Sequence, residues 1–111
     1  MFNLTEDKME RLSVIIAEIN SRTGKNYDAD VVIKAMFQIK DLLMKSESLR
    51  TKARNNTEQD FEFAYYDDVD DALIEGLEQN QDFFSLLLNN DELKRQILGI
   101  FTSEIYNSLR T

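Results

Sequence analysis

Hydrophobic residues recur at helical spacing along most of this chain. The first apolar stripe consists of Met9, Leu12, Ile15, Ile16 and Ile19. A stripe with this spacing is typical of an amphipathic helix, and we predict one from Thr5 to about Arg22. Gly24 lies just past this stripe, in the place where glycine often ends a helix.

A second, longer helix is predicted from Asp28, whose carboxylate can cap it, to about Arg54. One face of this helix carries Val32, Ala35, Met36, Ile39, Leu42, Leu43 and Ala53. The opposite face carries Ile33, Phe37 and Met44. A helix that is apolar on two sides is either the central helix of a bundle or a helix whose second stripe docks a partner. We favour the central position, because burial in the domain's own core is the more frequent fate of apolar residues.

The segment that follows gives two conflicting signals. Thr57, with Asp60 three residues later, can start a short helix. The aromatic residues Phe61, Phe63 and Tyr65 instead alternate with the period of two that is typical of a strand. Because a single strand would have no partner in an otherwise helical chain, we expect a loop or a short helix here.

The remainder of the chain predicts three further helices. They run from Asp67 or Asp68 to Asn80, from Asp82 to the break at Asn89 and Asn90, and from Asp91 through Leu109. Proline is absent and there are only three glycines, so little interrupts the helical pattern. We therefore predict an all-α fold, namely a single compact domain over residues 1–111 with about five helices, one long central helix and no sheet.

The net charge of −8 is unevenly distributed. Between Thr57 and Asp82 there are ten acidic residues and no lysine or arginine, whereas between Lys34 and Asn56 six basic residues accompany two acidic ones. An acidic domain repels the phosphate backbone of nucleic acids at long range. Any contact with DNA would therefore have to be local and supported by other parts of a larger assembly.

The chain contains neither cysteine nor histidine. It therefore lacks disulfides, thiol nucleophiles, and the commonest general base and metal ligand of proteins. The absence of cysteine favours a cytoplasmic protein. No apolar run approaches the roughly 20 residues that cross a bilayer, so we expect no membrane contact. We assign no catalytic, cofactor-binding or metal-binding residue in this chain.

Two sets of charged residues are candidates for binding. The candidate DNA contacts are Lys34, Lys45 and Lys52, which project within about 20° of one another on the predicted second helix. Solvated lysines beside a core-facing stripe are the commoner origin of such a pattern. The candidate partner contacts are Asp67, Asp68, Asp70, Asp71 and Glu75. These acids also have a structural explanation, since acids at the start of a helix offset the macrodipole by ~0.3 to 1 kcal/mol each.

The second half of the chain resembles a known family. The segment concerned is DFEFAYYDDVDDALIEGLEQNQDFFSLLLNNDELKRQILGIFTSEIYNSLR, residues 60–110. It contains an aspartate-alanine-leucine triplet, a polar break, an aromatic-leucine run, an asparagine turn and a final helical stripe. This order resembles the extreme C-terminal segment of the motor (restriction) subunit of type I restriction-modification enzymes. The first half, with NSRTGKNYDADVVIKA, fits that family more loosely.

The resemblance implies that the chain is a C-terminal fragment of a larger protein, with Met1 as an expression start. In that family a nuclease and two motor lobes precede a helical region, which contacts the methyltransferase and specificity subunits and helps to hold the complex on DNA. The parent complex would be an ATP-dependent, site-specific endonuclease that uses ATP and magnesium, whereas this chain carries no counterpart of the nuclease or ATP-binding motifs. It would be a non-catalytic assembly and DNA-engagement domain.

The alternative is an independent small acidic protein that mimics DNA or caps a basic partner. In that case the acids between Thr57 and Asp82 would stand in for phosphates. The basic residues grouped between Lys34 and Asn56 speak against a mimic, which would need acids over its whole face.

Overall fold

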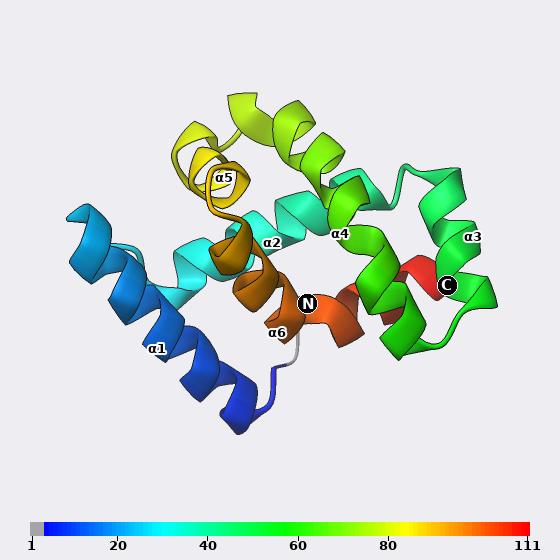
Figure 1. Ribbon diagram of the computed structural model, residues 1–111, viewed down its shortest axis with the longest axis horizontal. Helices are drawn as coiled ribbons and strands as arrows, with labels where there is room; N and C mark the ends of the chain where they lie inside the picture. Colours follow the sequence, from blue (N-terminus) through cyan, green and yellow to red (C-terminus); the bar gives the residue numbers. More distant parts are fainter. Residues whose placement is uncertain (1–3) are drawn as a thin grey trace.

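The computed structural model describes residues 4–111, apart from the side chain of Asp67. This part of the chain forms six α-helices and one short 3-10 helix and contains no strand (Figure 1). The elements are α1 (Glu6–Thr23), α2 (Ala29–Leu43), α3 (Glu47–Asn55), α4 (Glu58–Glu75), η1 (Gly76–Glu78), α5 (Gln81–Leu88) and α6 (Asp91–Arg110). The predicted all-α fold is confirmed, with more helices than the five expected. Met1, the expected start of expression, lies outside the described residues.

Each α-helix begins after a residue whose side-chain oxygen accepts a hydrogen bond from a backbone N–H of the first turn. These capping residues are Thr5, Asp28, Ser46, Thr57, Asn80 and Asn90. Such a cap satisfies a donor that the first turn leaves free and contributes about 1 kcal/mol. Helix α1 ends at Gly24, whose φ of 71° lies in the left-handed region that glycine adopts without strain. The predicted ends of the first helix and the predicted cap at Asp28 are therefore confirmed.

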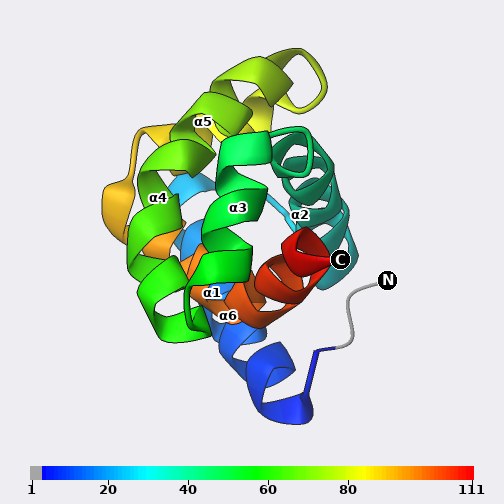
Figure 2. The same cartoon turned by 90° about the vertical axis from the view of Figure 1, so that its right-hand side faces the viewer.

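Helix α6 is the centre of the fold, because it packs against all five other α-helices. Its buried stripe includes Ile97, Leu98, Phe101, Ile105 and Leu109. Helices α1 and α3 lie at opposite sides of the molecule in Figure 1, and Figure 2 shows α3 beside the C-terminal end of α6. The central position that we expected for the predicted second helix is thus held by the last one.

The long second helix predicted from Asp28 to Arg54 is in fact two helices, and that expectation was wrong. The chain leaves α2 through two tight turns, in which the backbone N–H groups of Lys45 and Ser46 donate to carbonyls three residues earlier, at 3.2 and 3.0 Å. The Ser46 hydroxyl then caps α3 by accepting from the backbone N–H of Leu49. The break turns α3 toward α4 and α6 instead of extending α2.

The second apolar stripe of α2 packs within the domain. Its members Ile33, Phe37 and Met44 are half-buried against the single hydrophobic core of the described residues. The chain therefore covers this stripe by itself, and no partner is needed to shield it.

The segment expected to be a loop or a short helix is the first half of α4. Phe61, Tyr65 and Val69, four residues apart, are fully buried on one side of this helix. The rings of Phe61 and Tyr65 stack with their centroids 4.8 Å apart. The strand-like alternation misled because Phe63 points to solvent with 76% of its surface exposed. The cap at Thr57 was correctly identified, whereas the length of the helix was not.

Candidate functional site

The three candidate DNA contacts do not form a common stripe. Lys34 lies in α2, Lys45 in the connection to α3, and Lys52 in α3. Lys34 and Lys45 are exposed, whereas the half-buried Lys52 places its ammonium 3.3 Å from a carboxylate oxygen of Asp68 on α4. The predicted alignment depended on one continuous helix, and the break before Ser46 removes it.

Two of the candidate partner contacts bind lysines of this chain instead. Asp68 pairs with Lys52, and Asp70 pairs with Lys94 of α6 at 2.8 Å. The Lys94 side chain is only 6% exposed and also lies 3.3 Å from Asp91. Burial alone would lower the pKa of Lys94, but the hydrogen bonds to Asp70 and Asp91 outweigh it and raise the pKa above its ordinary value. These contacts join α4 to α3 and α6, so they are structural.

The other candidate acids stay available to a partner. Asp71 and Glu75 are exposed, and neither forms an ion pair with any residue in the described part of the chain. Asp60, in the first turn of α4, is also exposed and forms no ion pair with any described residue. The side chain of Asp67 lies outside the described residues.

Two large hydrophobic side chains lie on the same side of α4 as these acids. Phe63 is 76% exposed and Ile74 is 59% exposed. They are eleven residues apart, so they lie about 20° apart around the helix and about 16 Å apart along it. We call the surface formed by Asp60, Phe63, Asp71, Ile74 and Glu75 the α4 outer face. Its apolar residues were not among the candidates predicted from the sequence, although a helical projection of residues 58–75 would have found them.

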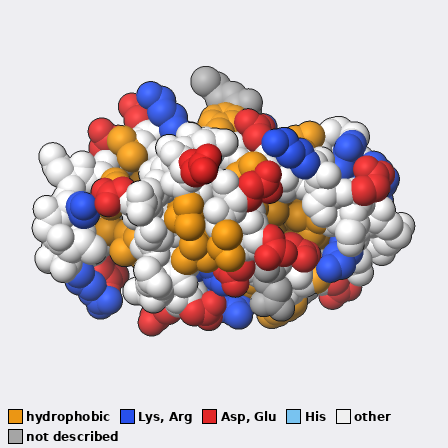
Figure 3. All heavy atoms as spheres, turned by 90° about the horizontal axis from the view of Figure 1, so that it is seen from above, with side chains coloured by type: hydrophobic (Ala, Val, Ile, Leu, Met, Phe, Trp, Pro, Cys, Tyr) orange, Lys and Arg blue, Asp and Glu red, His pale blue; other side chains and the backbone are white. Residues whose placement is uncertain are grey.

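Figure 3 views the molecule from above, onto the C-terminal half of α4 and onto α5. Hydrophobic side chains gather there with acidic side chains among and beside them. Beside the α4 outer face is a hollow of about 120 Å³ between α4 and the junction of α2 with α3. Its lining includes the apolar Leu42, Leu43 and Leu49 and the acidic Asp68, Asp71 and Glu75. The hollow therefore has nearly buried leucines at its base and, at its edge, Asp71 and Glu75, which form no ion pair with any described residue.

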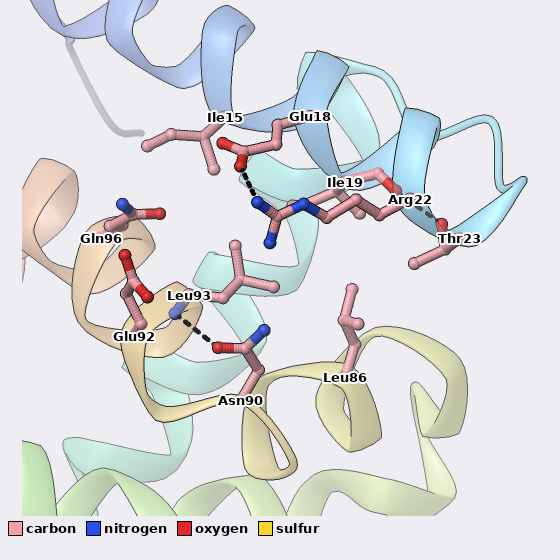
Figure 4. A pocket seen from close by; sticks show the side chains of 10 residues that line it. All are labelled: Ile15, Glu18, Ile19, Arg22, Thr23, Leu86, Asn90, Glu92, Leu93 and Gln96. Atoms are coloured by element: carbon pink, nitrogen blue, oxygen red, sulfur yellow. Dashed lines mark hydrogen bonds and ion pairs between the residues drawn. The ribbon is translucent and has the colours of Figure 1, made fainter.

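A second hollow of about 100 Å³ lies between α1, α5 and the start of α6 (Figure 4). Its apolar lining is formed by Ile15, Ile19, Leu86 and Leu93. Two of the charged groups at its mouth pair with each other, since the Arg22 guanidinium lies 2.6 Å from the Glu18 carboxylate. This hollow can take an apolar side chain. Glu92, which also lines it, is exposed and forms no ion pair with any described residue.

The described residues contain neither a cluster of metal-ligating side chains nor a helix that could span a membrane. No three acidic side chains among the described residues are placed so that they could hold a metal ion. None of the described helices is both long enough and apolar enough to cross a bilayer.

Comparison of the chain with protein-family models, curated proteins and solved structures finds no match. The fold and the surface define an all-α domain whose most distinctive exposed feature is the α4 outer face. The resemblance to the motor subunit of type I restriction-modification enzymes rests on the sequence of residues 60–110, and the function that it implies stays a prediction.

Proposed function

We propose that this chain is a non-catalytic assembly domain that binds a basic protein surface through the α4 outer face. The observation that carries the proposal is the exposure of Phe63 and Ile74 among acids that have no partner among the described residues. Aromatic side chains such as that of phenylalanine are enriched at protein interfaces relative to the rest of the surface. Unpaired charges around them speed association with a surface of opposite charge and reject other surfaces.

The proposed assembly is the motor subunit of a type I restriction-modification enzyme, docked on its methyltransferase and specificity subunits in the cytoplasm. The resemblance of residues 60–110 supports this choice of partner. The parent complex would bind ATP and magnesium and would cleave DNA elsewhere in its motor subunit. This chain contributes docking, and its exposed Lys34 and Lys45 are the DNA contacts that remain available.

Charge reversal tests the docking proposal. Asp71→Lys combined with Glu75→Lys should slow association with the methyltransferase and specificity subunits by about tenfold or more, because both acids lose their attraction to the basic surface. Stopped-flow or surface-plasmon association rates measure this effect. Glu10→Lys combined with Asp30→Lys changes the net charge equally, far along the chain from α4, and should have a much smaller effect. Equal slowing by both pairs would contradict a specific role of the α4 outer face.

The DNA contribution is measured separately in the parent subunit. Replacing Lys34 and Lys45 by glutamine should flatten the salt dependence of DNA binding by roughly 0.9 in log–log slope for each of the two lysines that contacts a phosphate. Assembly with the other subunits should be unaffected. An unchanged slope would remove DNA engagement from the proposed function and leave docking in place.

An independent acidic cap of a basic protein is the second candidate, because the α4 outer face would serve that role equally well. Basic side chains lie among the acidic ones on the face seen in Figure 3, which argues against a DNA mimic. The identity of the bound partner distinguishes the two candidate functions. Failure to bind the methyltransferase and specificity subunits, with retention of binding to another basic protein through Asp71 and Glu75, would favour the cap.

A further inference from the structure

We infer that the α4 outer face receives one amphipathic helix of the partner, whose apolar stripe contacts Phe63 and Ile74 and whose lysines or arginines meet the acids. This inference rests on the proposed function, in that it names the element of the basic partner that binds. Three features of the molecule support it, namely the shape of α4, the hollow beside it and its charge.

The shape of the surface favours a helix as the occupant. Helix α4 has 18 residues and is therefore about 27 Å long. Phe63, at the end of the first third of α4, and Ile74, in its last turn, lie about 20° apart around the helix and about 16 Å apart along it. A partner helix that lies along α4 presents apolar residues at the same separation, at positions i, i+4, i+7 and i+11. A loop or a globular corner would reach one of the two anchors but not both.

The hollow beside the α4 outer face adds a place for one basic side chain. Leu42, Leu43 and Leu49 offer an apolar floor, and Asp71 and Glu75 stand at the rim. Lysine and arginine have the matching chemistry, because each carries an aliphatic stem that packs on apolar surface and a charged head that stays at the rim. Its volume of about 120 Å³ suits one such side chain.

The charge of this surface argues against other occupants. DNA and anionic membranes carry the same sign as the α4 outer face, so both are repelled. A second copy of the chain would bring Asp60, Asp71 and Glu75 against their own equivalents, in a protein of net charge −8. A basic segment of another protein gains from the acids and from the apolar anchors together.

The test uses the 111-residue chain and two labelled peptides. One peptide of about 20 residues carries leucines at i, i+4, i+7 and i+11 with lysine and arginine elsewhere, and the other has the same composition without the stripe. Fluorescence anisotropy at about 0.15 M salt measures the affinity, and backbone amide shifts locate the site. The striped peptide should bind at least about tenfold more tightly, with shifts confined to α4 and the α2–α3 junction.

Variants of the chain identify the surface. Phe63→Ser with Ile74→Ser should weaken the striped peptide about tenfold or more, and Val14→Ser with Val31→Ser, which changes two exposed valines elsewhere, should not. Equal binding of the two peptides would overturn the helix inference while leaving a basic partner in place. Absence of peptide binding would also overturn it, and the proposed function would still stand if the methyltransferase and specificity subunits bound through Asp71 and Glu75. Shifts centred on the hollow between α1, α5 and the start of α6 would overturn both assignments of surface.

Discussion

Tyr65 shows how a single polar atom is accommodated in this core. The residue is fully buried, and its hydroxyl lies 3.2 Å from the Leu98 carbonyl and 3.2 Å from the Thr102 hydroxyl. Burial raises the pKa of Tyr65 far above its ordinary value, so the phenol stays neutral and can donate to the carbonyl. The contact joins the aromatic side of α4 to the middle of α6.

Tyr65→Phe should destabilise the chain by about 0.5 to 1.5 kcal/mol in a urea unfolding experiment. The loss is moderate because the ring keeps its stacking on Phe61, and the Leu98 carbonyl still accepts from the Thr102 hydroxyl at 2.9 Å. Tyr27→Phe is the matched control, since its hydroxyl donates to Asp82 at the surface and should contribute less. An equal loss for both variants would contradict the role given to the buried hydroxyl.

At the scale of elements, α4, α5 and α2 pack closely together where α4 ends. Gly76 is buried at the start of η1, and a Cβ atom added to it would lie 2.5 Å from the Phe84 ring and 3.0 Å from a methyl carbon of Leu42. Only glycine lets α4, α5 and α2 come together at this point. Gly99 differs, because it lies inside α6 and an added Cβ would have its nearest neighbours at 3.9 Å.

The same substitution at these two glycines should therefore have opposite effects. Gly76→Ala should destabilise the chain by about 1 to 3 kcal/mol through overpacking against Phe84. Gly99→Ala should stabilise it by about 0.5 to 1 kcal/mol, since alanine loses less backbone entropy in a helix and causes no clash. Thermal unfolding monitored by far-UV circular dichroism measures both. Effects of the same sign would contradict the packing described around η1.

The elements also differ in how far the sequence predicts them. The first helix was predictable because its stripe and its two end signals at Thr5 and Gly24 agree. The break before Ser46 was not, because Leu49 and Ala53 keep the helical phase of Leu42 across it. The start of α4 was obscured by the outward Phe63, which created a false alternation. For the candidate surface, the sequence proposed Asp68, Asp70, Asp71 and Glu75 alike, because the pairing of Asp70 with Lys94 depends on how α6 crosses α4.

At the scale of the whole molecule, folding favours the protonated state of three groups that pack in or against the core, namely Tyr27, Tyr66 and Lys94. Burial, followed by the proximity of Glu62, raises the pKa of Tyr66 to about 12, although the nearby Arg95 partly offsets this. The pKa of Tyr27 is also raised, by burial and by Asp82, and that of Lys94 is raised by its acidic partners. All of these groups bind protons more tightly in the folded state than in the unfolded state.

Stability should therefore be lost on the alkaline side. A group whose pKa is raised on folding stabilises the fold fully below its unfolded pKa, which is 10.0 for tyrosine, and this contribution is lost as the pH rises toward the folded value. The melting temperature should change little between about pH 7 and 9 and should fall between about pH 10 and 12. Differential scanning calorimetry measures this fall, and Tyr66→Phe should reduce its steepness. A steeper fall of the melting temperature in Tyr66→Phe would contradict the expected direction of the effect.

The sequence does not predict which helix each apolar stripe packs against. Each apolar stripe can be recognised alone, but the sequence contains no signal that the last stripe touches every other helix. That assignment depends on the crossing of six helices in three dimensions, and it decides which acids find lysines of the same chain.

The central position of α6 also has a consequence for biosynthesis. Among these helices α6 leaves the ribosome last, and its contacts with α1 and α3 join residues far apart in sequence. The first five α-helices therefore lack their shared neighbour until translation of this segment is nearly complete. The apolar side chains that pack on α6 stay exposed to chaperones and proteases during that interval. Contacts of such long range also slow folding relative to a bundle whose helices pair in order along the chain.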